Sequence, residues 1–217
     1  MKTAAAIVII IALVSVFHKE KKHEPPPVIS RPSTSSTVKP GSGAYAIPDF
    51  STLGYELPAD QQAAANKIVA FAKERYKNRA ASDEILYKVA AGIVKYSAYY
   101  QIDYALAAAL IARESGFNPN ATSPHGAKGL GQLIDSTASH MGISDPYDID
   151  QNLRGSLGYF KKLLDMSSGL SSPTERALIS YLVGPGAVSK DDSFLNNQKN
   201  QEYISTILGF REQILNR

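Results

Sequence analysis

From residue 60 to the end of the chain, apolar side chains recur every three or four positions, as they do along helices that bury one face. No alternating run is long enough to predict a strand, although a short hairpin within residues 118–130 fits the pattern. The spacing predicts helices that begin at Asp60 and at Ser82, and further helices over Asp103 to Gly116, Gln132 to Met141, Asp150 to Met166, Ser172 to Val183 and Asn200 to Leu215. We therefore expect an all-α domain over residues 59–217, long enough to enclose one core.

Residues that commonly cap helices stand at several of these predicted starts. Asp60, Ser82 and Asp103 each precede an apolar-periodic run. The segment Ser172-Pro173-Thr174-Glu175 has the order of a capping box with proline at the first helical position. Local sequence therefore supports the helix starts independently of the apolar pattern.

The N-terminal segment has a different character. Residues 4–17 are apolar apart from Ser15, which is the length of a signal-peptide core and shorter than the roughly 20 residues that span a bilayer. No small-x-small cleavage site follows, so residues 1–17 are predicted to be an uncleaved hydrophobic anchor rather than a removed signal. Its orientation stays open, because the lysines at 19, 21 and 22 outnumber Lys2 on the other side.

Residues 18–58 have the composition of a linker. Pro25-Pro26-Pro27, a Ser/Thr run over residues 33–37 and Gly41-Ser42-Gly43 supply too few apolar groups for a core. We expect this segment to be extended in its proline-rich part and flexible in its Gly/Ser part, so that it holds the domain away from a membrane.

Composition narrows the chemistry. The 217 residues include no cysteine, which excludes disulfides, thiolate metal sites and a lipid-modified N-terminal cysteine. His125 and His140 lack metal-ligand spacing, and Lys128-Gly129 lacks the frame of a phosphate loop. The formal charge of +3 is mild and is compatible with an anionic polymer as partner. We expect no metal, no cofactor and no nucleic-acid partner.

Glu114 is the leading catalytic candidate. It shares the helical stripe of Ala107, Leu110 and Ile111, so it should be partly desolvated, and it lies in the last turn before Gly116. Burial and the helix dipole both disfavour a negative charge there and raise the pKa, as a general acid near neutral pH requires. The alternative interpretation is a solvated charge at a helix end.

The sequence that follows Glu114 resembles the soluble lytic transglycosylase family of the lysozyme superfamily. The family pattern E-S-x-F-N-P, a serine, G-A-x-G-L-x-Q and T-A is matched by residues 114–119, Ser123, residues 126–132 and residues 137–138. The resemblance continues through Asp148 to Leu164, through Tyr181-Leu182-Val183-Gly184-Pro185-Gly186 and at Tyr203, so that it covers about residues 90–215. It departs where Leu182 replaces an asparagine, Val183 an alanine, Lys199 a carboxylate, Ile149 a proline and Gly131 the common methionine.

The resemblance implies a lysozyme-like domain that cleaves the MurNAc–GlcNAc bond of peptidoglycan. In this family one glutamate, here Glu114, acts as acid and then as base, and the product ends in a 1,6-anhydro ring. Matching positions imply substrate contacts at Ser123, Gly129, Gln132, Tyr181 and Tyr203. Ser123 could instead be a turn residue before Pro124, and Tyr181 and Tyr203 could belong to the core.

Two other functions stay open from the sequence alone. Glycoside hydrolysis usually uses two carboxylates, and a muramidase could recruit one of the downstream acids, Asp135, Asp145, Asp148 or Asp150, with Asp135 the first candidate. Because Leu182 removes a polar group that contacts sugar in the family, the chain could also be a catalytically weakened, anchored wall-binding module. We expect a monomeric catalytic domain tethered in the bacterial periplasm, or, alternatively, a virion-associated protein or part of a secretion system.

Overall fold

The structure is a computed structural model that describes residues 57–77, 82–188 and 191–217. The predicted anchor and nearly all of the predicted linker lie outside these residues. Within the described ranges, no helix has both the length and the apolar character needed to cross a bilayer. The described helices belong to one compact unit of the chain.

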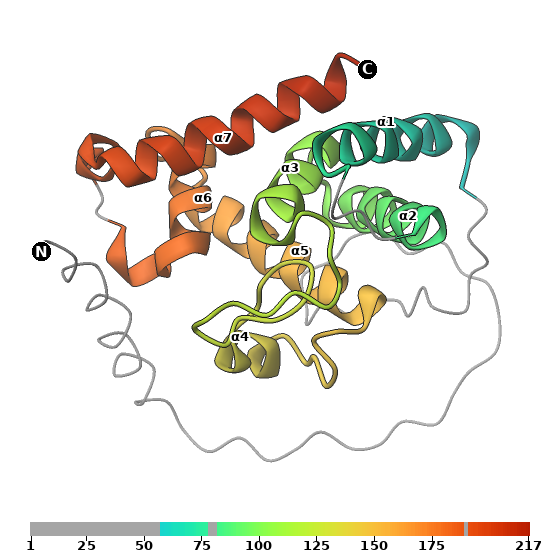
Figure 1. Cartoon of the computed structure of the whole chain (residues 1–217). Coiled ribbons are helices and arrows are strands. Elements are labelled where there is room, and N and C mark those ends of the chain that lie inside the picture. Colours follow the sequence, from blue (N-terminus) through green and yellow to red (C-terminus); the bar gives the residue numbers. More distant parts are fainter. Residues whose placement is uncertain (1–56, 78–81, 189–190) are drawn as a thin grey trace, which may run out of the picture. The chain divides into compact units, whose positions relative to one another are not determined.

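The prediction of an all-α domain is confirmed, and no strand occurs in the part of the chain that the structure describes (Figure 1). The long helices are α1 (Ala59–Arg75), α2 (Asp83–Tyr100), α3 (Tyr104–Ser115), α5 (Ile149–Ser167), α6 (Pro173–Val183) and α7 (Gln198–Leu215), with the short helix α4 (Asp135–His140) between α3 and α5. Two 3-10 turns, η2 (Pro185–Ala187) and η3 (Ser193–Asn196), connect α6 to α7.

Helix α3 lies at the centre of the described unit, beneath α7 and beside α1 and α2 in Figure 1. Every residue from 105 to 112 is buried, and five of these eight are alanines, which let neighbouring helices approach closely. Helix α5 packs against α2 on one side and α6 on the other. Burial decreases at the end of α3, where Arg113 is exposed and Glu114 is partly buried, so the carboxylate lies between the core and the surface.

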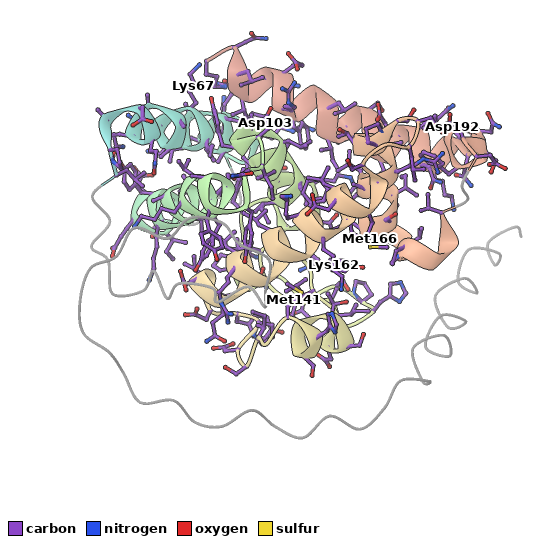
Figure 2. All side chains as sticks on the ribbon, turned by 180° about the vertical axis from the view of Figure 1, so that it is seen from behind. Lys67, Asp103, Met141, Lys162, Met166 and Asp192 are labelled. Atoms are coloured by element: carbon purple, nitrogen blue, oxygen red, sulfur yellow. The ribbon has the colours of Figure 1, made fainter. Side chains whose placement is uncertain are left out.

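Two polar contacts join α7 to α1 and to the start of α3. The ammonium group of Lys67 on α1 donates to the carbonyl of Leu215 at 2.7 Å, and Arg211 donates to the carboxylate of Asp103 at 2.6 Å. Lys67 and Asp103 are labelled in Figure 2, which shows α7 crossing the ends of α1 and α3. These contacts fix the long α7 helix over the helix that carries Glu114.

The structure corrects several predicted helix ends. Asp103 and Ser82 cap α3 and α2 as expected, but Pro58 precedes α1, which begins at Ala59, before Asp60. Ser172 adopts a left-handed backbone with φ of 48°, and its side chain makes no cap hydrogen bond, so the predicted capping box is wrong. Gln132 likewise has φ of 50°, which no α-helix accepts, so α4 starts at Asp135.

The other boundaries moved by one or two residues. Helix α5 begins after Asp148, whose carboxylate accepts the Gln151 amide at 2.8 Å. Helix α7 begins after Asn197, which caps Lys199 and Asn200. The hairpin considered within residues 118–130 is reduced to isolated antiparallel bridges, Thr122 with Lys128 and Lys128 with Leu133.

Candidate active site

Glu114 lies in the last turn of α3, where the chain reverses direction. Gly116 ends the helix with φ of 60°, as the sequence predicted, and Phe117 follows with φ of 63°. A left-handed backbone is strained for phenylalanine, but its ring is 1% exposed and packs edge-on against Phe71 and Tyr76. The burial of this ring offsets the strain and fixes the turn directly after Glu114.

Tyr203 of α7 reaches Glu114 across 89 positions of sequence. Its hydroxyl donates to Oε1 of Glu114 at 2.5 Å, and Tyr203 itself is buried. The guanidinium of Arg113 stands 5.2 Å from the centre of the Tyr203 ring, within cation–π range. The hydrogen bond from α7 therefore binds Oε1 of the carboxyl and does not involve Oε2.

Electrostatics favour the protonated form of Glu114. Burial raises the pKa of its carboxyl, and the hydrogen bond from Tyr203 and the charge of Arg113 lower it in part. Burial and the neighbouring Glu114 also raise the pKa of Tyr203 and of Tyr181 well above the ordinary value of 10.0, so both phenols stay protonated near neutral pH. The site combines a carboxyl that resists ionisation with two hydroxyls that can donate.

A glycine turn over residues 129–131 forms a second side of the site. Gly129 has φ of 73°, and a Cβ placed there would lie 2.1 Å from the Pro146 carbonyl oxygen. A Cβ at Gly131 would lie 2.2 Å from Cβ of Ser156. Side chains are excluded at both positions, because other parts of the protein already occupy the space.

Asn152 of α5 holds this turn in place. Its side chain is fully buried; Oδ1 accepts the Gly131 amide at 2.7 Å, and Nδ2 donates to the carbonyls of Lys128 and Pro146 at 3.1 and 2.7 Å. Three hydrogen bonds from one amide thus tie the glycine turn to the segment before α5. The carbonyl of Gly131 in turn accepts the hydroxyl of Tyr181 at 2.7 Å.

The structure brings Glu114, Tyr181, Tyr203 and the glycine turn together, but gives Ser123 and Gln132 contacts within the loop. The Ser123 hydroxyl accepts the amides of His125 and Ala127, which is the turn role considered as its alternative. Nε2 of Gln132 donates to the carbonyls of Ala121 and Gly129 at 3.2 and 2.9 Å. Both donor hydrogens of that amide therefore close the loop, and its oxygen is the group left for a ligand.

The downstream acids considered as a second carboxylate have other contacts. Asp135 is paired with Lys128 at 2.7 Å and its side chain is 78% exposed. Asp145 and Asp148 accept backbone amides of Tyr147 and Gln151, and Asp150 accepts the hydroxyl of Tyr96 at 2.7 Å. No carboxylate of the described residues is among the groups that shift the pKa of Glu114.

Sequence reasoning missed the supporting roles of Asn152 and Ser156. Both are completely buried polar residues of α5, four positions apart among leucines 153 and 157. Polar residues repeating at helical spacing within an apolar stripe are unusual, because a buried polar group needs a partner. That pattern was visible in the sequence and indicates contacts to another segment.

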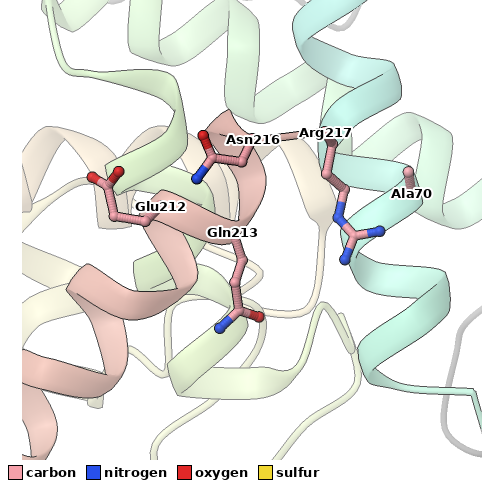
Figure 3. A pocket seen from close by; sticks show the side chains of 5 residues that line it. All are labelled: Ala70, Glu212, Gln213, Asn216 and Arg217. Carbon is pink, nitrogen blue, oxygen red and sulfur yellow. The ribbon is translucent and has the colours of Figure 1, made fainter.

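An open cavity lies elsewhere in the described domain. It measures about 490 Å³ and is lined by Ala70 of α1 and by Glu212, Gln213, Asn216 and Arg217 near the end of α7 (Figure 3). Glu212 follows Tyr203 by nine residues, about 14 Å along a helix. Within the described ranges, no cluster of His, Cys, Asp or Glu side chains could hold a metal ion.

Comparisons with known proteins agree with this geometry. A family model described as the transglycosylase SLT domain matches residues 92–204, which include Glu114, the glycine turn, Tyr181 and Tyr203. Among relatives, the membrane-bound lytic murein transglycosylase F of Desulfosudis oleivorans is 36% identical over 108 residues, covering 48% of this chain and 24% of the relative. The protein of the same name from Vibrio cholerae is 40% identical over 95 residues, covering 42% and 18%. The chain thus matches no more than about a quarter of the length of these relatives.

Proposed function

The chain belongs to the family of transglycosylase SLT domains, and from this membership and the geometry around Glu114 we propose that it is a peptidoglycan lytic transglycosylase. The relatives it resembles are named lytic murein transglycosylases. The observation that carries the proposal is a carboxyl of raised pKa that receives a tyrosine hydrogen bond, with no carboxylate of the described residues among the groups that shift its pKa.

In the first step we assign Glu114 the role of general acid. A proton passes from its carboxyl to the glycosidic oxygen between MurNAc and GlcNAc, and the bond from C1 to that oxygen breaks. The acetamido oxygen of the substrate then stabilises the cation at C1. Because Tyr203 donates to Oε1, we expect Oε2 to carry the transferred proton.

In the second step Glu114 acts as general base. The carboxylate takes the proton of the C6 hydroxyl, and O6 bonds to C1 to close a 1,6-anhydro ring. The carboxyl is then protonated again, and no water is consumed. A pKa raised by burial suits this cycle, since the same group must release and regain one proton near the operating pH.

We further propose peptidoglycan glycan strands as the ligand of Glu114, Tyr181, Tyr203, Gly129 and the amide oxygen of Gln132. The hydroxyl of Ser123 supports the loop, because it accepts the backbone amides of His125 and Ala127. The name "membrane-bound" that the relatives carry favours a tethered enzyme, with residues 1–17 as the tether and residues 18–58 as the spacer. A chain that starts at Leu57 should then digest wall fragments without associating with membranes.

The test is the chemistry of the products. Purified peptidoglycan digested with the protein should release muropeptides ending in 1,6-anhydro-MurNAc, one water lighter by mass spectrometry than lysozyme products. Glu114→Gln should lower the rate by at least about 10²-fold while retaining the fold, because one general acid contributes about 10²–10⁴-fold. Glu202→Gln makes the same change at an exposed position of α7 next to Tyr203 and should leave the rate unchanged.

Other results would identify the other functions. Products with reducing ends would show a muramidase, and Asp135 would then be the first acid to mutate. Equal wall binding by the wild-type and Glu114→Gln proteins, with no cleavage by either, would show a binding module. That outcome would give a role to Leu182 and Val183, which are 44% and 36% exposed at the end of α6.

A further inference from the structure

Helix α5 presents two buried polar side chains to the glycine turn, and one of them makes a hydrogen bond to it. Asn152 binds the Gly131 amide, as described above. Ser156 lies four residues further on, on the same face of the helix, and is also completely buried. Its side chain lies against Gly131 beside the hydroxyl of Tyr181, and its own hydroxyl donates to the Leu153 carbonyl at 3.4 Å.

Gly131 shows how tightly Ser156 and Tyr181 pack. Unlike Gly129, it has no positive φ, so its backbone conformation alone does not require glycine. A Cβ at position 131 would instead lie 2.2 Å from Cβ of Ser156, 2.7 Å from its Oγ and 2.9 Å from the Tyr181 hydroxyl. The Ser156 side chain therefore fills the space that a side chain at position 131 would need.

The Tyr181 hydroxyl is held from two directions. It donates to the Gly131 carbonyl at 2.7 Å, and the Ser156 side chain lies beside it at position 131. The Tyr181 ring also packs against Tyr159 and Phe160 of α5, with ring centres 5.6 and 6.1 Å away. Without Ser156, the ring contacts and the hydrogen bond to Gly131 would still hold the phenol, but its hydroxyl would lose the side chain that packs beside it at position 131.

We propose that Ser156 is a positioning residue: it fixes the Tyr181 hydroxyl in the site of Glu114, and it is the reason that position 131 carries no side chain. The claim that Ser156 positions Tyr181 for catalysis rests on the proposed function. The claim that Ser156 excludes a side chain at position 131 does not. Ser156 itself touches no reacting atom, since Gly131 and Tyr181 lie between it and the site.

A double-mutant cycle tests the first half of the proposal. Ser156→Ala, Tyr181→Phe and the double variant are compared in urea unfolding and in the rate of wall digestion. If Ser156 acts through the Tyr181 hydroxyl, Ser156→Ala should lower kcat about tenfold with KM within about twofold, and should have little further effect once Tyr181 is phenylalanine. Additive effects on both unfolding and kcat would overturn this half.

Ser97→Ala is the matched control. Ser97 is a buried serine of α2 whose hydroxyl has no hydrogen-bond partner among the described residues. Removing that hydroxyl should leave kcat unchanged and should show no coupling to Tyr181→Phe. Comparable coupling at Ser97 and Ser156 would mean that any buried serine gives the effect, and would overturn the assignment.

A rescue experiment tests the second half. Gly131→Ala should lower the melting temperature and the rate of digestion, and Ser156→Gly in the same chain should restore most of both by removing the Cβ that lies 2.2 Å away. Ser97→Gly also places a glycine inside a helix but should restore neither. Failure of Ser156→Gly to raise the melting temperature of Gly131→Ala would overturn the packing argument.

The melting temperatures distinguish a failure of this proposal from a failure of the proposed function, because they do not depend on activity. A wild-type protein that forms no anhydro ends disproves the function, while the rescue in melting temperature still judges the pairing of positions 131 and 156. Wild-type activity with additive variants and no rescue disproves the role of Ser156 alone.

Discussion

The two sides of the Glu114 carboxyl are built differently. On the glycine side, three hydrogen bonds of the buried Asn152 join the turn to the segment before α5. On the tyrosine side, one hydrogen bond from Tyr203 and one Arg113–Tyr203 contact link Glu114 to α7. The first side depends on buried groups whose hydrogen bonds stabilise the turn, and the second on groups that change the pKa of one carboxyl.

The largest effect should come from Asn152→Asp, which attacks the glycine side. The carboxylate would replace the Nδ2 donor with an oxygen facing the Lys128 and Pro146 carbonyls, so that buried acceptors repel one another and lose their donor. We expect a loss of about 2–4 kcal/mol in the free energy of unfolding, measured in urea.

The control for this change lies on the same helix. Asp148→Asn makes the reverse exchange, from carboxylate to amide, at the N-cap of α5. Aspartate and asparagine both accept an amide hydrogen there equally well, so the change should cost less than about 0.5 kcal/mol in the free energy of unfolding. If the two variants lose similar stability, the contacts of Asn152 to the turn are not what stabilises it.

Tyr203→Phe should affect chemistry more than stability. It removes the donor to Glu114, and since that hydrogen bond lowers the pKa of the carboxyl, its loss raises the pKa further. The alkaline limb of kcat/KM should move to higher pH, and kcat should fall about tenfold, as expected for a lost bond of about 1.5 kcal/mol to a charged group. Unfolding should change by no more than about 1 kcal/mol.

A matched phenol separates this effect from the loss of any tyrosine hydroxyl. Tyr87 of α2 is half-buried, and Tyr87→Phe should leave both the pH profile and the unfolding free energy unchanged. An unshifted profile in Tyr203→Phe would contradict the assigned role of the 2.5 Å bond.

A smaller effect is expected from Glu114→Gln on stability, and its sign depends on pH. The folded pKa of Glu114 lies above its unfolded value of about 4.5, so the folded state binds more protons between the two values. The stability that Glu114 contributes is complete below the unfolded pKa and is lost as the pH rises through the folded pKa. Glu114→Gln should therefore be more stable than the wild type at neutral pH, by less than the Asn152→Asp loss, with the difference closing below pH 4.5.

Thermal unfolding of both proteins across that pH range checks the sign. A glutamine variant that is less stable than the wild type at neutral pH would mean that the ionised carboxylate, not the neutral acid, is the form that the fold favours.

The smallest effect belongs to Asp135→Asn. This residue forms an exposed ion pair with Lys128, and such pairs contribute about 0–1 kcal/mol. The muropeptides should still have the masses of 1,6-anhydro products, and the rate of digestion should stay within about twofold of the wild-type rate. A loss of activity comparable to that of Glu114→Gln would instead indicate a second catalytic carboxylate.

Local residues were enough to predict α3 and the position of Glu114. Asp103 and Gly116 act through neighbours within one helical turn, and the apolar stripe of α3 repeats at a spacing that only a helix buries. The prediction failed where a single residue adopts a left-handed backbone. Gln132 and Ser172 both have sequence contexts typical of helix starts, yet they adopt φ of 50° and 48°.

The sequence by itself determined the helices, the family and a carboxylate at the end of a buried helix, because each depends on spacing along the chain. Only the tertiary structure decided which groups surround that carboxylate. Tyr203, the Gly131 carbonyl and Asn152 come from segments separated by 21 to 89 positions, and their hydrogen bonds exist only after α5, α6 and α7 have packed. The pKa of Glu114 is likewise a product of packing, because burial is its largest cause and no local pattern measures how much water the folded neighbours exclude.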